Sequence, residues 1–124
     1  MAAPNLINPS GIVGKTQVIS PTGVNETTLL TNAASSNKVL KTSSLIVANA
    51  HGSSNIDCTI NFYDSATSGT AFPIISTVSI PADSTVVVLG KDSPLWIEED
   101  RRLTVVAGSG NAVLDVFCSY EEIS

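Results

Sequence analysis

The chain has 124 residues, with six lysines and arginines against eleven aspartates and glutamates and a formal net charge of −5. A chain of this length fits one domain and buries roughly two-thirds of its unfolded surface, enough for a core without metals or disulfides. The basic residues are scattered along the sequence, so the negative charge argues against nucleic acid as a partner.

The first 14 residues contain prolines, glycines and asparagines but little periodicity. This composition predicts an extended N-terminal arm ahead of a single domain at 15–124. The arm has apolar side chains, so it is expected to dock on a neighbouring subunit or a partner, with a simple frayed end as the alternative. Its candidate contact residues are Leu6, Ile7, Ile12 and Val13.

Short extended segments follow the arm. Residues 15–20 predict a first strand with a turn at 20–23, and the threonine-rich segment 25–32 predicts a second strand at an edge of a sheet. The segment 38–50 is apolar on both faces near its centre, which predicts a central strand covered on both sides. In 56–64 apolar residues alternate strictly with polar ones, so this strand should line the core.

The second half continues the pattern. Segment 72–80 predicts a strand whose Pro73 confines it to an edge or a bulge. Within 80–100, apolar runs at 86–89 and 95–97 flank a turn and predict two strands paired as a hairpin. The remaining predicted elements are a strand at 102–107, a hairpin turn at 108–111 and a last strand at 112–120.

Charged residues make up only 14% of the chain, and β-branched residues are abundant. Such a composition favours strands over surface helices, which need charged residues on their wet face. Eight or nine strands at spacings of about ten residues are typical of an antiparallel sandwich. The sequence therefore predicts an all-β fold, an antiparallel β-sandwich with a jelly-roll-like arrangement.

The N-terminal sequence has no basic segment followed by an apolar run, so we expect no secretory signal, and no apolar run is long enough to span a bilayer. A protein made in a reducing cytosol rarely keeps disulfides. Cys58 and Cys118 are therefore expected to be buried thiols, with a disulfide between strands as the alternative.

We expect no catalytic, cofactor or metal site. The sole histidine, His51, lies in a Gly/Ser turn, and no nucleophile elbow accompanies it. Zinc would need more Cys and His ligands than the chain offers at motif spacing. The acidic residues 98–100 point to alternate sides of a strand and precede Arg101 and Arg102, so a self-neutralising turn is a better interpretation than a calcium site.

Trp96 is the aromatic residue that most needs an explanation, since tryptophan stacks on sugars and is also enriched in cores and interfaces. Its neighbours Leu95 and Ile97 are apolar. We expect Trp96 to lie in the core or at a subunit interface, and sugar binding is the alternative.

The segment IPADSTVVVLGKDSPLWIEED, the following RRLTVVAG and the ending CSYEEIS resemble small structural proteins of tailed bacteriophages, notably those of marine cyanobacteria. The opening MAAPN and the segment VLKTSSLIVAN are similar too. The resemblance implies a non-enzymatic virion component, most simply a capsid decoration (cement) protein on the head, made in the host bacterial cytoplasm. The expected partners are the major capsid protein or other virion proteins.

Symmetric self-association, as a homotrimer at three-fold positions of the shell, would match this role and cover edge strands. A neck, tail or fibre-type component is one alternative function. A sugar-binding β-sandwich module is the other.

Overall fold

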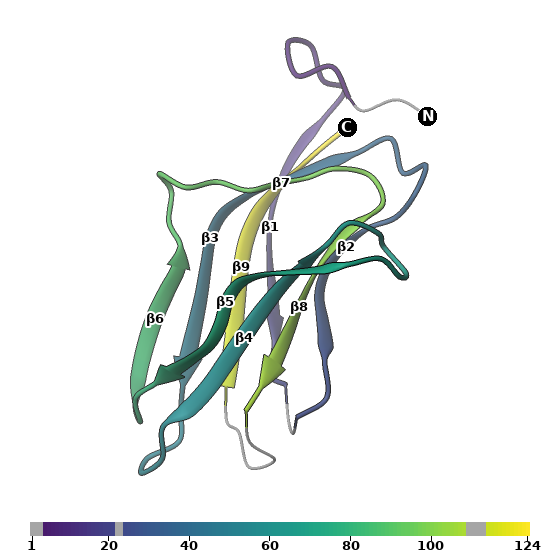
Figure 1. The fold of residues 1–124 in the computed structure, drawn as a ribbon. Coiled ribbons are helices and arrows are strands. Elements are labelled where there is room, and N and C mark those ends of the chain that lie inside the picture. Colours follow the sequence, from purple (N-terminus) through teal and green to yellow (C-terminus); the bar gives the residue numbers. More distant parts are fainter. Residues whose placement is uncertain (1–3, 22–23, 109–113) are drawn as a thin grey trace.

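The computed structural model describes residues 4–21, 24–108 and 114–124, and these residues form strands and connections without a helix (Figure 1). Alternating apolar and polar residues build most of the strands, since one face of each packs on the core. The strands are β1 (Ile12–Ile19), β2 (Thr27–Asn32), β3 (Val39–Asn49), β4 (Ile56–Tyr63), β5 (Ala71–Ile80), β6 (Ser84–Leu89), β7 (Trp96–Ile97), β8 (Arg101–Ala107) and β9 (Leu114–Ile123).

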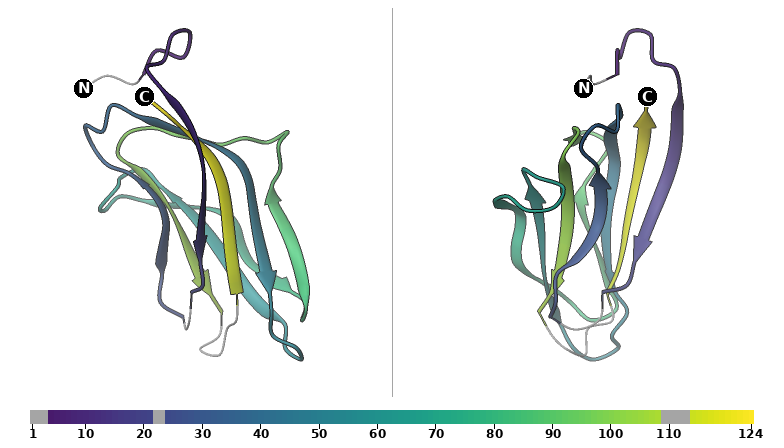
Figure 2. Two further views of the ribbon diagram at one scale, coloured as in Figure 1. Left: turned by 180° about the vertical axis from the view of Figure 1, so that it is seen from behind. Right: turned by 90° about the vertical axis from the view of Figure 1, so that its right-hand side faces the viewer.

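The strands form two antiparallel sheets. The five-stranded sheet has the order β1-β9-β3-β6, with β7 also paired to β3, and the four-stranded sheet has the order β2-β8-β4-β5. Apart from the β4–β5 hairpin and the short β7, each strand is followed by one in the opposite sheet, which is the jelly-roll arrangement. The side view in Figure 2 shows the two layers. The predicted all-β sandwich is confirmed.

The core lies between the two sheets. In β4 the predicted alternation is confirmed: Ile56, Cys58 and Ile60 are buried, and the residues between them are partly exposed. In β9, Val116 and Cys118 are buried in the same way from the opposite sheet. Strict alternation in the sequence therefore identified β4 as a strand that lines the core.

Two strands are longer than predicted. β1 begins at Ile12 rather than Lys15, so residues 12–14 of the predicted arm belong to the sheet, and β9 ends at Ile123 rather than Tyr120. The cause is mutual pairing, since Ile12 lies opposite Ile123 in the β1–β9 ladder. This partner is remote in sequence, so the local pattern does not reveal it.

The segment 80–100 is not the predicted hairpin. Both β6 and β7 pair antiparallel with β3, β6 along 45–49 and β7 along Leu40 and Lys41. They therefore run in the same direction, and the turn between them carries the chain along the edge of β3 without reversing it. The sequence correctly predicted the turn residues, but the predicted pairing of the two strands with each other is wrong, because both pair with β3.

Two predicted turns fall on residues outside the described ones. These are residues 22–23 of the turn at 20–23 and residues 109–111 of the turn at 108–111; residues 1–3 of the arm also lie outside. The flanking strands β8 and β9 belong to different sheets. The prediction of a hairpin there is therefore wrong.

The edge and centre positions were predicted correctly for three strands. β2 and β5 are the two edges of the four-stranded sheet, and β3 lies in the middle of the other sheet. The predicted cover on both sides of β3 is wrong, however, because Ile46 and Ala48 on its outer face remain partly exposed. The outer face of this sheet is thus a surface of the molecule.

Candidate functional site

The outer face of the five-stranded sheet carries a continuous line of apolar side chains, which we call the apolar row. Val18 on β1 lies opposite Phe117 on β9, Phe117 lies opposite Ile46 on β3, and Ile46 lies opposite Val87 on β6. Val87 is 62% exposed, Val18 49% and Phe117 37%. Cross-strand register therefore assembles, from four separate segments, an apolar line across the sheet.

The side chains on either side of the apolar row already have partners. On one side the hydroxyl oxygens of Thr16 and Ser119 lie 3.0 Å apart. On the other, Ser20 donates a hydrogen bond of 2.6 Å to the carboxylate of Asp115. An exposed apolar line with a polar border is typical of a surface that contacts another protein.

The N-terminal segment ahead of β1 is exposed but fixed at its base. The backbone N–H groups of Ser10 and Gly11 donate to the Ser124 carbonyl at 2.6 and 3.1 Å, and Ser124 donates back to Gly11 at 2.9 Å. Beyond this anchor Leu6 is 53% and Ile7 95% exposed. The segment projects from the end of the sandwich where the C-terminus also lies (Figure 1).

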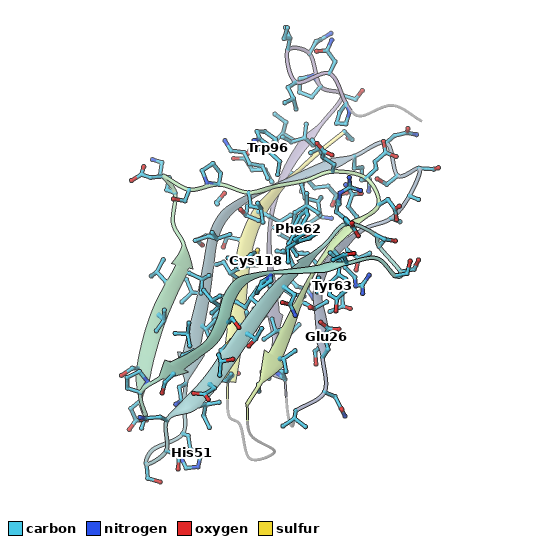
Figure 3. All side chains as sticks on the ribbon, in the orientation of Figure 1. Glu26, His51, Phe62, Tyr63, Trp96 and Cys118 are labelled. Carbon is cyan, nitrogen blue, oxygen red and sulfur yellow. The ribbon has the colours of Figure 1, made fainter. Side chains whose placement is uncertain are left out.

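Trp96 on β7 is 40% exposed, so of the two expected places the core is excluded. The Nζ of Lys41, its neighbour on β3, lies 5.5 Å from the centre of the indole ring. The indole borders a cavity of about 570 Å³ at the same end of the molecule as the N-terminal segment (Figure 3). The lining residues are Pro4, Leu6, Val39, Trp96, Glu98 and Glu99.

The structure brings together only part of the predicted contact set. Leu6 and Trp96 line this cavity, which we call the Trp96 pocket, whereas Ile7, Ile12 and Val13 do not. Ile12 and Val13 are exposed residues of β1, at an edge of the sheet. Sequence reasoning identified the N-terminal residues but missed the apolar row, because only the register between remote strands creates it.

The acidic turn after β7 is only partly self-neutralising. Glu98 lies 3.9 Å from the guanidinium of Arg101, and Asp100, with a positive φ of 62°, accepts a hydrogen bond from the backbone N–H of Ala66 at 2.9 Å. The Oε2 atom of Glu99 is buried and accepts no hydrogen bond from the described residues. This oxygen is an exception among buried polar groups, which are nearly always paired.

A second polar cluster lies on the outer face of the four-stranded sheet. The Glu26 carboxylate accepts hydrogen bonds from Tyr63 at 2.8 Å, Thr104 at 2.6 Å and Asn61 at 3.3 Å, and the Arg102 guanidinium stacks on the Tyr63 ring at 3.7 Å. Glu26 and Tyr63 are neighbours in Figure 3. No sequence motif indicated this cluster, since its members come from three segments that are far apart in the sequence.

Opposing effects act on the pKa of the Glu26 carboxyl group. Burial raises this pKa, but the hydrogen bonds from Thr104, Tyr63 and Asn61, with the charge of Arg102, bring it below its usual value. The hydrogen bond with Glu26 raises the pKa of the Tyr63 hydroxyl. Each group around Glu26 already forms a hydrogen bond or a stacking contact within the cluster. The cluster is therefore best explained as a structural link that joins β4 and β8 to the segment just ahead of β2.

His51 closes a turn. Its Nδ1 accepts hydrogen bonds from the backbone N–H groups of Ser53 at 3.2 Å and Ser54 at 3.1 Å. It lies at the opposite end of the sandwich from Trp96 (Figure 3). The imidazole thus stabilises the turn through hydrogen bonds with its backbone.

The two cysteines are unpaired and fully buried, Cys58 from one sheet and Cys118 from the other. Burial raises the pKa of each thiol to about 11. The prediction of two buried thiols is confirmed. Neither thiol meets the conditions for a reactive cysteine, which are exposure and a lowered pKa.

Within residues 4–21, 24–108 and 114–124, no three His, Cys, Asp or Glu side chains lie together in a way that would hold a metal ion. The same part of the chain contains no helix of the length and apolarity needed to cross a membrane.

Comparison with known proteins adds a likeness of fold. No protein-family model and no curated protein matches the chain. A solved structure of a protein from Bacillus endospore appendages, described as a novel family of disulfide-linked pili, is 17% identical and has a TM-score of 0.52. The match covers 91% of this chain and 88% of that chain. At this level of identity the likeness bears on the β fold alone.

Proposed function

We propose that this protein is a non-enzymatic structural component of a tailed bacteriophage virion, a capsid decoration protein that binds the assembled head. The observation that carries the proposal is the apolar row Val18–Phe117–Ile46–Val87 on the outer face of the five-stranded sheet. The resemblance of the sequence to phage structural proteins supports the same role.

A decoration protein works by linkage. It binds the assembled shell but not the dissociated subunits, and this difference in affinity stabilises the shell. The apolar row would lie against the major capsid protein or another virion protein, and the N-terminal segment would reach a neighbouring capsomer. The net charge of −5 suits the outside of the head, away from packaged DNA.

The appendage protein raises the idea of a self-assembled fibre. Its family is described as disulfide-linked. In this chain Cys58 and Cys118 are both fully buried in the core, so they cannot cross-link copies of the folded protein. A fibre of this chain would need non-covalent contacts, which is one reason to favour a role on the head.

A sugar-binding module is the second candidate, and the exposure of Trp96 beside two carboxylates favours it. Sugars stack on exposed indole rings, and their hydroxyl groups donate hydrogen bonds to nearby carboxylates. A Trp96→Ala variant should then lose binding on a glycan array while keeping its fold. Absence of any glycan signal from the unmodified protein removes this candidate.

The proposal is tested by mixing the purified protein with phage heads that lack it and measuring cosedimentation. Val87→Asp places a charge in the apolar row and should weaken binding about tenfold or more, because an unpaired carboxylate resists burial. Val24→Asp is the matched control, since Val24 is 59% exposed in the β1–β2 connection. Equal binding by the two variants would refute the role of the row.

A further inference from the structure

The Trp96 pocket has a composition that points to a particular kind of ligand. Apolar side chains from the N-terminal segment, β3 and β7 form its walls, and two carboxylates from the acidic turn complete it. From this combination we infer that the pocket binds a cationic side chain, a lysine or arginine that a partner protein presents beside an apolar residue.

The walls fit the stem and the head of such a side chain. Leu6, Val39 and Pro4 provide apolar surface of the kind along which the methylene groups of lysine and arginine pack. Trp96 provides an indole ring, the aromatic group that attracts cations most strongly. A cavity of about 570 Å³ is large enough for one long side chain and a neighbouring apolar residue.

The carboxylates of Glu98 and Glu99 would make the pocket specific for a positively charged side chain. Glu98 is weakly paired, at 3.9 Å from the Arg101 guanidinium. Glu99 has a buried Oε2 that receives no hydrogen bond from the described residues. A buried carboxylate oxygen without a donor is costly. Because this oxygen is closed to solvent, an N–H group of a guanidinium or ammonium reaches it only when the Glu99 side chain turns toward the pocket, and the charge-assisted hydrogen bond then removes that cost.

Two cations of this chain lie near the pocket, and neither pairs with the Glu99 carboxylate among the described contacts. Lys41 lies over the indole, so an incoming cation has to share the ring with Lys41 or displace it, and Lys41 forms no ion pair with Glu98 or Glu99 among the described contacts. The Nη1 of Arg101 donates at 3.0 to 3.4 Å to backbone carbonyls, those of Asp64, Glu99 and Asp100. The described residues thus supply no donor for the Oε2 of Glu99, and the inference assigns that donor to the partner protein.

As an account of the partner, the inference rests on the proposed function, because the protein that presents the cation would be a subunit of the head. As an account of the pocket, it stands on the side chains alone. The two are separated by testing the pocket first with peptides, in the absence of any capsid.

Trp96 is the only tryptophan in the chain, so its fluorescence reports on this pocket directly. The probes are the peptides acetyl-Leu-Arg-Leu-amide and acetyl-Leu-citrulline-Leu-amide, which have the same shape and differ in charge. The arginine peptide should change the Trp96 emission and bind at least about tenfold more tightly than the citrulline peptide, since charge-assisted hydrogen bonds are the stronger ones.

Glu99→Gln should lower the affinity of the protein for the arginine peptide by about tenfold. Asp92→Asn, on the exposed turn before β7, should leave this affinity unchanged. Thermal unfolding of both variants checks that they are folded. Equal affinity for the two peptides, no emission change with either, or full affinity in Glu99→Gln would overturn the inference. Failure of the unmodified protein to bind heads, with the peptide result intact, would instead overturn the proposed function.

Discussion

Glu26 shows how a single exposed carboxylate can tie separate segments together. It accepts hydrogen bonds from side chains on β4 and β8 while lying just ahead of β2. Although burial acts to raise its pKa, these hydrogen bonds outweigh that effect and lower the pKa from the usual 4.5. A lowered pKa means that the ionised form stabilises the folded state.

The direction of the pH dependence follows. The stabilisation of the folded state by the ionised Glu26 carboxylate is complete above the usual pKa. It is lost as the pH falls through the lowered pKa of the folded state. Glu26→Gln should reduce the free energy of unfolding by about 1 kcal/mol or less at pH 7, since solvent screens the exposed group. The difference from the unmodified protein should be smaller at an acidic pH, below the lowered pKa of the folded state, than at pH 7.

Urea unfolding at the two pH values measures this difference. Asp92→Asn, at an exposed position with no ion pair among the described residues, should show no comparable loss. A loss of stability in Glu26→Gln that is the same at both pH values would show that the carboxylate charge is not involved.

The buried thiols give a second prediction at the residue scale. Cys58 and Cys118 are fully buried, and burial raises the pKa of each to about 11, so the folded protein should not react with a thiol reagent at neutral pH. In denaturant without reductant both cysteines should react. Rapid labelling of the folded protein, or a missing thiol after unfolding, would contradict the buried, unpaired state.

Among the elements, the N-terminal segment has the clearest testable role. Removal of residues 1–9 leaves β1 whole and keeps the hydrogen bonds between Gly11 and Ser124, so the truncated protein should remain folded. It should bind heads about tenfold or more weakly, because the apolar surface of Leu6 and Ile7 is lost.

The measurement is cosedimentation with heads, supported by thermal unfolding of the truncated protein. Leu6→Ser and Ile7→Ser together in the full chain provide the matched variant, which keeps the length of the segment. Full affinity in both variants would show that the segment is not a contact.

The elements also show how far sequence patterns reach. Strict alternation identified β4 and its buried face, because a half-buried strand imposes a period of two on its own residues. Pro73 correctly indicated an edge strand. The pairing of β6 and β7 with β3 was missed, because which strands pair is decided by residues remote in sequence.

The dependence on residues remote in sequence also limited the prediction of the Trp96 pocket and the apolar row. Trp96 and Leu6 were recognised as contact candidates from their apolar context, but their meeting in one pocket with Glu99 depends on the path of the N-terminal segment. Val18, Phe117 and Val87 are unremarkable residues of separate strands. Only the register of the ladders aligns them into the apolar row.

For the whole molecule, the proposed homotrimer would place copies around a local three-fold axis of the head. Exposed edge strands such as β1 are ready to pair or pack with another chain, and symmetric assembly would cover them. Sedimentation equilibrium at micromolar concentration should therefore show a trimer. A strictly monomeric protein under these conditions would count against a preformed trimer.

Electron cryomicroscopy of intact particles tests the proposed place of this protein in the virion most directly. Density of the two-layered sandwich is expected on the outer surface of the head, with the outer face of the five-stranded sheet against the shell. Density at the neck or tail, or absence of the protein from the particle, would contradict it.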